Sequence, residues 1–381
     1  MSGIIWSELF PTRLTLGIFI GYIVLFISQG ILVTASQDES SNYHYDTVCV
    51  VLLTEFWKLI ISMALYCRSN TFESLIKETV KNKHLLLLYF IPSFLYCVYN
   101  NLTFKNLATF DPTTYYLLLQ FRVVITGILF QVIFKKILTR RQWISLILLT
   151  LGCMLKQLPI NDIFKVSKEL NQSTTMNGAE HLNNDKSNRI YNTKNTTGLD
   201  LSIDAIYILI QLICSCLAGV YNEYLLKGDG ARVNIYIQNF FMYMDSVVCN
   251  LLFLILQGNL ISAFNMANLS SVFTLNVILI IFNNAAIGIV TSFFLRYLNS
   301  ILKTFASALE LLFTAFLCYM FFNIAIHLNT VLSIGVVSIS IYLYSLSPVM
   351  NINNRSFNEK KSVCVNVQEN IPLIEDDAEM V

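Results

Sequence analysis

The sequence predicts an all-α integral membrane protein with ten transmembrane helices, arranged as two inverted five-helix halves. Three observations predict it. Of the 381 residues, 55% are hydrophobic and only 13% are charged, whereas ordinary soluble domains carry roughly 25% charged residues. Apolar runs of about 20 residues, the length that crosses a bilayer, recur along the chain. One long polar segment divides these runs into two groups of five.

The apolar runs follow one another with short polar turns between them. In the first group they lie near residues 13–33, 47–67, 84–104, 112–134 and 141–158. In the second group they lie near residues 201–226, 234–257, 273–295, 304–323 and 327–348. The chain therefore divides into an N-terminal half (1–158), a polar linker (159–200), a C-terminal half (201–348) and a tail (349–381). An odd number of spans in each half inverts the second half relative to the first, as in many carriers that bind their cargo between the halves.

Basic residues in the short turns predict that both termini face the cytosol, because cytosolic loops carry an excess of Lys and Arg. The turns on the side of the N-terminus hold Arg68, Lys77, Lys81, Lys83, Lys135, Lys136, Arg140, Arg141, Lys227, Arg232, Arg296 and Lys303. The opposite turns at 34–46, 258–272 and 323–327 hold neither Lys nor Arg. The linker is then lumenal, where its sequons at Asn171 and Asn195 are open to glycosylation.

Composition argues against several classes of function. The net charge of +1 gives no overall field that would attract nucleic acid. The nine cysteines are scattered through apolar segments without a CxxC pair, and the four histidines lie far apart in sequence. We therefore expect buried thiols rather than a metal or redox site, no cofactor, and the lipid bilayer as the surroundings of most of the chain.

Two pairs of opposite charges lie within apolar runs, where ionisable groups are usually functional or paired. Glu55 and Lys58 are three residues apart and share a helix face. They are either a pair that lines a cavity for an anion or a structural ion pair between helices. Glu223 and Lys227 are spaced i, i+4 near the cytosolic end of their span, where a structural or gating pair is as good an interpretation as substrate contact.

Two cations stand apart from these pairs. Arg122 lies about ten residues into an apolar run. We therefore expect its side chain either to face a wet cavity or to pair with an acidic residue, for which Glu55 and Glu223 are the candidates. Tyr115 precedes it by seven residues, two helical turns, and is expected on the same face. Lys303 is followed directly by an apolar run, which makes it a site candidate rather than a surface anchor.

Amide and phenol side chains recur at helical spacing in both halves. Tyr96 and Asn100 are four residues apart, with Asn101 beside them, and Asn239 and Tyr243 repeat this spacing in the seventh run. Carboxamides donate and accept hydrogen bonds, as the edge of a pyrimidine and a ribose require. The alternative for adjacent amides at the end of a span is capping of the helix.

Six motifs combine these residues into a joint pattern. They are T-E-x-x-K at 54–58, Y-x-V-x-N-N at 96–101, Y-x-x-x-x-Q-x-R at 115–122, G-V-Y-x-E-x-x-L-K at 219–227, N-x-x-M-Y at 239–243 and G-x-x-T-S-x-x-x-R-Y at 288–297. The pattern resembles the Golgi nucleotide-sugar transporters of the CMP-sialic acid and UDP-galactose carrier group. The resemblance covers both halves, about residues 14–347.

The resemblance implies a carrier in the Golgi membrane and no enzymatic activity. Its cargo would be a nucleotide sugar, UDP-galactose or a related UDP-sugar, exchanged for the nucleoside monophosphate UMP. It also implies that Lys303 contacts the phosphates, and Arg122 stands where the group usually has lysine. The positions that match cavity residues around the nucleotide and ribose are Tyr115, Asn100, Asn101, Asn239 and Tyr243, with small polar positions at Thr291 and Ser292. Ala306 and Glu310 depart from the group's pattern, which leaves the sugar open.

Three other functions remain as alternatives. The first is a ten-span exporter of another small metabolite. The second is a membrane-embedded transferase, against which the sequence shows no D-x-D motif and no cluster of His. The third is a scaffold or sorting protein without transport, suggested by the tail segment E-N-I-P-L-I from Glu369 to Ile374, which has the acidic-dileucine form that coat adaptors bind. A homodimer is a further partner that the sequence leaves open.

Overall fold

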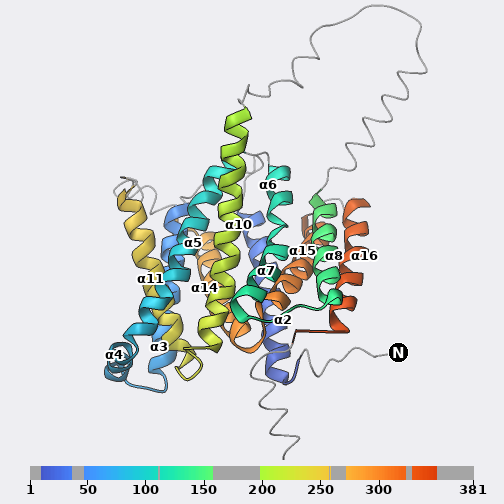
Figure 1. The fold of residues 1–381 in the computed structure, drawn as a ribbon. Helices are drawn as coiled ribbons and strands as arrows, with labels where there is room; N and C mark the ends of the chain where they lie inside the picture. Colours follow the sequence, from blue (N-terminus) through green and yellow to red (C-terminus); the bar gives the residue numbers. More distant parts are fainter. Residues whose placement is uncertain are drawn as a thin grey trace, which may run out of the picture.

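The computed structural model describes residues 10–36, 47–109, 112–157, 198–256, 258, 272–322 and 328–349. Over these residues all regular secondary structure is helical (Figure 1). The sequons at Asn171 and Asn195 and the tail motif from Glu369 to Ile374 lie outside the described residues.

The helices follow the expected apolar runs closely. In the first half they are α2 (Arg13–Ala35), α3 (Thr47–Cys67), α4 (Phe72–Lys81), α5 (Lys83–Thr109), α6 (Pro112–Leu119), α7 (Arg122–Phe134) and α8 (Arg140–Gln157). In the second half they are α10 (Gly198–Lys227), α11 (Ile235–Leu256), α14 (Leu275–Tyr297), α15 (Ser300–Phe322) and α16 (Leu328–Ser345). The structure thus confirms the all-helical class, with two local differences at α4 and at the junction of α6 and α7.

Eight candidate membrane spans are long and apolar enough to cross a bilayer. Seven are the single helices α2, α3, α5, α10, α11, α14 and α16, and the eighth combines α6 and α7 as Thr114–Phe134. Helices α8 and α15 are not among them; α8 begins with Arg140 and Arg141 and carries Lys156 near its end. Within the described residues the multi-pass membrane class is therefore confirmed, and the count of ten spans is not.

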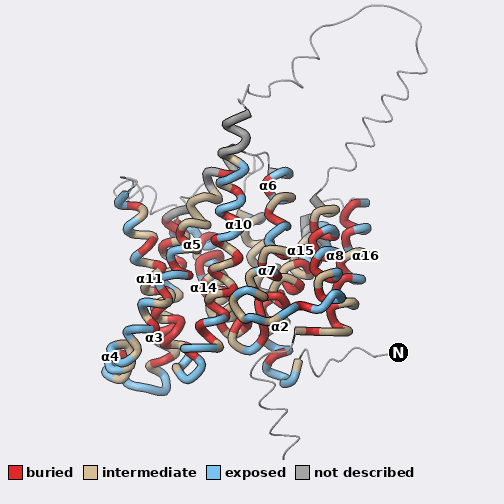
Figure 2. Tube along the Cα trace, viewed as in Figure 1, coloured by how far each residue is buried: buried red, intermediate tan, exposed pale blue. Residues whose placement is uncertain are grey.

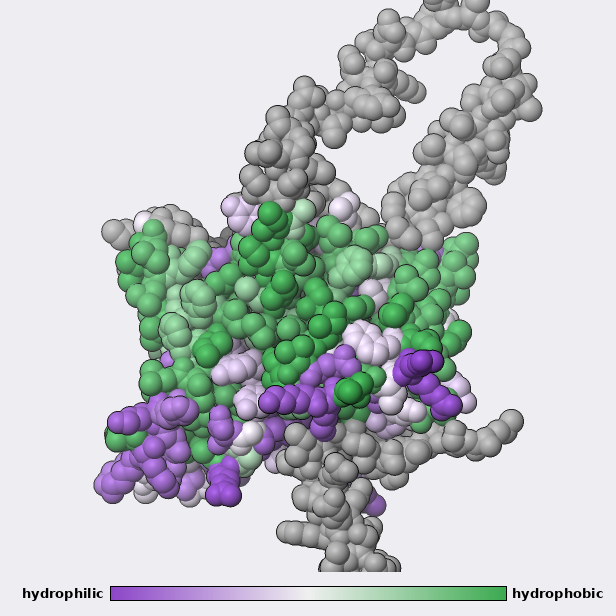
Figure 3. Space-filling model, in the orientation of Figure 1, coloured by the Kyte–Doolittle hydropathy of each residue, from purple (hydrophilic) through white to green (hydrophobic). Residues whose placement is uncertain are grey.

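The short helix α4 occupies a segment that the sequence predicted only as a basic turn. Thr71 caps its start by accepting a hydrogen bond from the backbone N–H of Ser74 at 3.3 Å. Leu75 is buried against the neighbouring helices, whereas Phe72 and Ile76 are exposed. Figure 3 shows that hydrophilic side chains gather around α4 at one end of the molecule, and that apolar side chains cover most of the visible face beyond it.

The two halves pack against each other in matching pairs of helices. Helix α2, the first of its half, packs against α14 and α15, and α10, the first of the second half, packs against α5 and α7. In the same way α3 packs against α14, and α11, the next helix after α10, packs against α5. Two further contacts join helices in the same place of each half, namely α3 with α11 and the last helices, α8 with α16. This arrangement places the interior of the bundle at the interface of the halves.

Small residues and serine hydroxyls hold α8 against α16. Ser333 and Ser340 each donate a 2.6 Å hydrogen bond to a backbone carbonyl of α8, that of Gly152 and that of Ser145. A Cβ added to Gly152 would lie 2.8 Å from Cγ2 of Val337, so the two backbones approach closely. Such contacts are common between helices in membranes, where the hydrophobic effect does not drive helices together.

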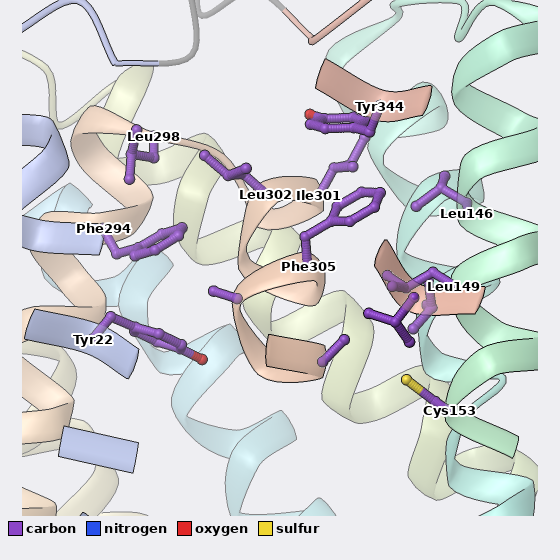
Figure 4. Packing of buried hydrophobic residues seen from close by; sticks show 14 of the residues in the cluster. Tyr22, Leu146, Leu149, Cys153, Phe294, Leu298, Ile301, Leu302, Phe305 and Tyr344 are labelled. Atoms are coloured by element: carbon purple, nitrogen blue, oxygen red, sulfur yellow. The ribbon is translucent and has the colours of Figure 1, made fainter. Parts of the chain in front are cut away.

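The largest hydrophobic cluster surrounds the first half of α15. Phe305 stacks on Tyr344 of α16 with ring centroids 4.3 Å apart, and Phe294 of α14 packs on Tyr22 of α2 at 4.8 Å (Figure 4). Ala306 belongs to the same cluster and is fully buried. Figure 2 shows buried residues along most of the helices, including α15 and the helices next to it. The cluster therefore fixes the helix that carries Lys303.

Candidate functional site

Three adjoining cavities lie between the halves. The central cavity, about 240 Å³, is lined by Glu55, Lys58, Ser93, Tyr96, Asn100, Asn222, Met242, Tyr243, Ser246, Gly288, Thr291, Ser292 and Lys303. The Arg122 cavity, about 140 Å³, includes Gln120, Arg122, Thr126, Ser215, Cys216, Lys303, Thr304, Ser307 and Glu310. The Gln29 cavity, about 230 Å³, includes Gln29, Thr54, Glu55, Lys58, Asn100, Asn284 and Gly288. Together these volumes fall within the roughly 300–1,000 Å³ of small-molecule sites.

Shared side chains connect the three cavities. Lys303 lines both the central cavity and the Arg122 cavity. Glu55, Lys58 and Asn100 line both the central cavity and the Gln29 cavity. The structure therefore brings together most of the residues that the sequence singled out, from both halves, around three adjoining cavities.

A tight turn interrupts the fourth apolar run just before Arg122. The backbone N–H groups of Gln120 and Phe121 bond to carbonyls three residues earlier, at the end of α6, and α7 starts at Arg122. The N–H groups of Val123 and Ile125 bond back to Gln120 and Phe121, so the backbone stays hydrogen-bonded across the turn. The positive charge that this segment brings to the cavity is therefore the guanidinium of Arg122.

Arg122 makes no ion pair within the described part of the chain, because both candidate partners are engaged elsewhere. Glu55 accepts a 2.6 Å hydrogen bond from Lys58. Glu223 accepts a 2.7 Å hydrogen bond from Lys227, and both of these side chains are almost fully buried. The interpretation of Arg122 as a structural partner of Glu55 or Glu223 is therefore wrong, and the wet cavity remains.

The Glu55–Lys58 pair forms one wall of the central cavity. The Lys58 ammonium lies 5.3 Å from the centroid of the Tyr243 ring, a cation–π contact that joins α3 to α11. Gly288 of α14 makes room for both, since an added Cβ would lie 2.7 Å from Cδ of Lys58 and 3.2 Å from the Tyr243 hydroxyl. Because both charges of the pair line a polar cavity, the interpretation as a cavity-lining pair is the one that the geometry favours.

The Glu223–Lys227 pair connects α10 to the start of α15. The second carboxylate oxygen of Glu223 accepts a 2.7 Å hydrogen bond from the backbone N–H of Ser300. Lys227 also donates to the backbone carbonyl of Leu298. Neither residue lines the three cavities, but Lys303 follows Ser300 by one helical turn. The pair therefore positions the helix that carries Lys303.

The predicted amide and phenol residues fall into two groups. Tyr96, Asn100 and Tyr243 line the central cavity. Asn101 instead donates a 2.8 Å hydrogen bond to the backbone carbonyl of Cys97. Asn239 is buried one turn before Tyr243, outside the three cavity linings. Spacing alone did not separate the residues that face the cavity from those that bond within the bundle.

Tyr115 lies in a buried hydrogen-bond network away from the cavity linings. Its hydroxyl accepts a 2.7 Å hydrogen bond from Gln211 of α10, which also bonds to Thr103 and Asn106 of α5. Arg122 also lies beside α10, since it lines its cavity together with Ser215 and Cys216, one turn after Gln211.

Thr291 and Ser292 line the central cavity as expected, and other residues of its wall were not predicted. Asn222 is buried, and its carbonyl oxygen Oδ1 has no hydrogen-bond partner among the described residues. Gln120 and Gly288 stand within the quoted motifs, so their positions were visible, but only the fold shows that they face the cavities. The signal that could have predicted Asn222 is a polar residue next to Glu223 within an apolar run.

Comparison with known proteins assigns the chain to a family. A model of the nucleotide-sugar transporter family matches residues 15–345. The chain belongs to the nucleotide-sugar transporter family. A relative from Drosophila melanogaster, the UDP-galactose transporter senju, is 59% identical over 349 residues, which are 91% of this chain and 90% of that protein.

More distant members of the nucleotide-sugar transporter family match over similar lengths. CMP-sialic acid transporter 1 of Oryza sativa subsp. japonica is 28% identical and covers 84% of this chain, and 91% of that protein is matched. CMP-sialic acid transporter 1 of Arabidopsis thaliana is 26% identical over 85% of this chain and 88% of that protein. One solved crystal structure shares the fold, with a TM-score of 0.57 and 10% identity over 87% of this chain and 95% of the other. The expected function, a nucleotide-sugar transporter rather than an enzyme, is confirmed.

Proposed function

We propose that the protein imports UDP-galactose, or a closely related UDP-sugar, into the Golgi lumen in exchange for UMP. The identity of 59% with a UDP-galactose transporter over nine-tenths of both chains supports the choice of cargo. The observation that carries the proposal for the site is the position of Lys303, which lines both the central cavity and the Arg122 cavity.

The lining of each cavity suits a different part of the cargo. The central cavity offers the amides of Asn100 and Asn222 and the ring of Tyr243, which fit a base and a ribose. Arg122 and Lys303 fit the phosphates. The sugar then enters the Arg122 cavity beyond Lys303.

The charges of the site favour obligatory exchange. A nucleoside diphosphate sugar carries about two negative charges, and a nucleoside monophosphate carries about −1.5 to −2. The cations Arg122 and Lys303 attract either cargo. Without cargo neither cation has an ion pair among the described residues, which disfavours reorientation of the empty protein. Exchange of the two cargoes moves little net charge.

The proposed membrane arrangement has ten spans, with both termini in the cytosol. Helices α8 and α15 supply the two spans beyond the eight that meet the length and hydropathy criteria. The matching helix pairs between the halves support two inverted repeats, with α8 and α16 as counterparts. The basic residues of α4 and of the start of α8 support a cytosolic position for that end.

Exchange by the purified full chain in proteoliposomes tests the function. Vesicles preloaded with UMP should take up labelled UDP-galactose, and empty vesicles should take up little. CMP, GMP and amino acids serve as competing solutes, so the panel separates a UDP-sugar carrier from an exporter of other metabolites. Equal uptake with and without internal UMP would contradict exchange, and no uptake of any UDP-sugar would contradict the proposed cargo.

A further inference from the structure

The face of α15 that lines the Arg122 cavity carries a carboxylate beyond the phosphate-binding end. Lys303, Ser307 and Glu310 are spaced i, i+4, i+7 and all line this cavity. At a rise of 1.5 Å per residue, Glu310 lies about 10 Å along the helix from Lys303. The cavity therefore has a cationic end and an anionic end, both on one helix.

Glu310 is poorly satisfied within the described part of the chain. Its one hydrogen bond comes from the Thr314 hydroxyl at 3.5 Å, and the cations Arg122 and Lys156 act on its charge without forming an ion pair with it there. An ionised carboxylate offers about four acceptor positions. Charged groups inside membrane proteins are costly and usually serve a substrate or a partner. Since α15 packs near the middle of the bundle, a carboxylate with a single long hydrogen bond at this position indicates a ligand that donates hydrogen bonds.

The neighbouring side chains fit the same kind of ligand. Thr126 and Ser307 add hydroxyl groups to the lining, and Ser307 lies 3.3 Å from the hydroxyl of Tyr22, a pair in which either oxygen can donate. A neutral hexose presents several hydroxyl donors close together. A hydroxyl that donates to a carboxylate forms a charge-assisted bond, about twice as strong as a neutral one.

We propose that Glu310 binds the hydroxyl groups of a neutral hexose and disfavours sugars that carry their own carboxylate. This inference rests on the proposed function, because it needs the phosphates at Arg122 and Lys303. The reasoning is geometric: a sugar attached to the phosphate at Lys303 extends along α15 toward Glu310. An acidic sugar there would bring two negative charges together, which is strongly unfavourable in a desolvated site.

Exchange of several cargoes by full-length Glu310→Ala and Glu310→Gln proteins tests the inference. For each protein the apparent affinities for UDP-galactose and UDP-glucuronate are divided by that for UMP, which has phosphate and nucleoside but no sugar. Glu310→Ala should lower the UDP-galactose ratio about 10- to 100-fold, the range expected for the loss of a hydrogen bond to a charged group. Glu310→Gln should raise the UDP-glucuronate ratio by at least about tenfold, because the like charge is gone.

A matched control comes from Glu73, an exposed carboxylate on α4 that is remote from the cavities. Glu73→Gln makes the same chemical change and should leave both ratios unchanged. UMP exchange reports on folding, and Glu310→Gln keeps the size of the side chain if Glu310→Ala folds poorly. Unchanged ratios in a Glu310 variant that still exchanges UMP would overturn the inference alone. Absence of UMP and UDP-galactose exchange in the unaltered protein would instead overturn the proposed function.

Discussion

Glu223 in α10 accepts a hydrogen bond from the backbone N–H of Ser300, the first residue of α15, at 2.7 Å. The same carboxylate bonds to Lys227 through its other oxygen, also at 2.7 Å. A negative charge at the N-terminus of a helix is favourable. The carboxylate thus compensates two positive groups at once, and it fixes α15 one turn before Lys303 enters the cavities.

The first prediction is that Glu223→Gln strongly destabilises the protein. Lys227 would then be a buried charge without its counter-ion, which costs roughly 3–5 kcal/mol. Lys227→Met should have a similar effect, because it leaves the buried carboxylate of Glu223 without the ammonium group of Lys227. Thermal unfolding of the detergent-purified protein, followed by fluorescence-detected size exclusion, measures both. The double variant should be more stable than either single variant, since no lone charge remains.

Equal stability of the two single variants and the unaltered protein would show that the pair contributes nothing to the fold. If both are stable but transport is lost, the pair acts as a gate rather than as a support for α15.

The second prediction concerns the membrane orientation. A protease site or tag in residues 159–197 should be protected in sealed Golgi vesicles, and one in the tail should be cleaved from outside. The reason is the excess of basic residues at the end of the bundle that holds α4 and the start of α8. Asn171→Gln and Asn195→Gln should each increase mobility on a gel if the sequons are used. Cleavage of the 159–197 segment from outside, with a protected tail, would reverse the orientation.

Much of the fold was predictable because membrane spans are local signals of length and hydropathy. Breaks within spans are not local. Pro92 lies inside α5 without ending it, whereas α6 ends at Leu119 with neither Pro nor Gly at the break. The turn at Gln120 and Phe121 depends on tertiary packing, so the sequence predicted one continuous helix there.

The same distinction holds for the site. The pairs Glu55–Lys58 and Glu223–Lys227 were predictable because three- and four-residue spacing places side chains together on a helix. The hydrogen bond between Glu223 and Ser300 joins residues 77 positions apart in the chain, and no sequence pattern in either segment predicts it. Tyr115 shows the same limit, since its spacing from Arg122 does not predict the hydrogen bond from Gln211 of α10 that holds its hydroxyl.

The third prediction is that Arg122 and Lys303 bind the phosphates of both cargoes. Lys303→Ala or Arg122→Ala removes a charge partner, at a cost of roughly 2–5 kcal/mol. This corresponds to roughly a 30- to several-thousandfold loss of apparent affinity. Arg122→Lys should retain part of the affinity because the charge is kept, whereas Lys303→Gln should not. Binding of UMP and of UDP-galactose, measured on the same purified samples as yield, should fall together.

If Arg122 and Lys303 had a structural role instead, the alanine variants would be obtained in lower yield. The protein that folds would still bind UMP normally. Normal UMP affinity in a well-folded Lys303→Ala protein would therefore remove Lys303 from the phosphate site.

The last prediction is that Gly288→Ala weakens nucleotide binding while the bundle stays folded. The added methyl group would lie 2.7 Å from Cδ of Lys58 and 3.2 Å from the Tyr243 hydroxyl, so one of them has to move. Lys58 is the more flexible, and its displacement lengthens the 2.6 Å contact with Glu55 in the wall of the central cavity. Overpacking of this kind costs roughly 1–3 kcal/mol, and we expect it to appear in UMP affinity.

Gly335 in α16 provides the matched control for Gly288→Ala. A Cβ added to Gly335 meets no atom within 4 Å. Because alanine favours helix over glycine by roughly 1 kcal/mol, Gly335→Ala should leave UMP affinity unchanged and slightly raise thermal stability. Both variants add one methyl group to a helix, so a difference in UMP affinity between them measures contact with Lys58 and Tyr243. If the two variants bind UMP equally well, the wall formed by Lys58, Tyr243 and Gly288 takes no part in nucleotide binding.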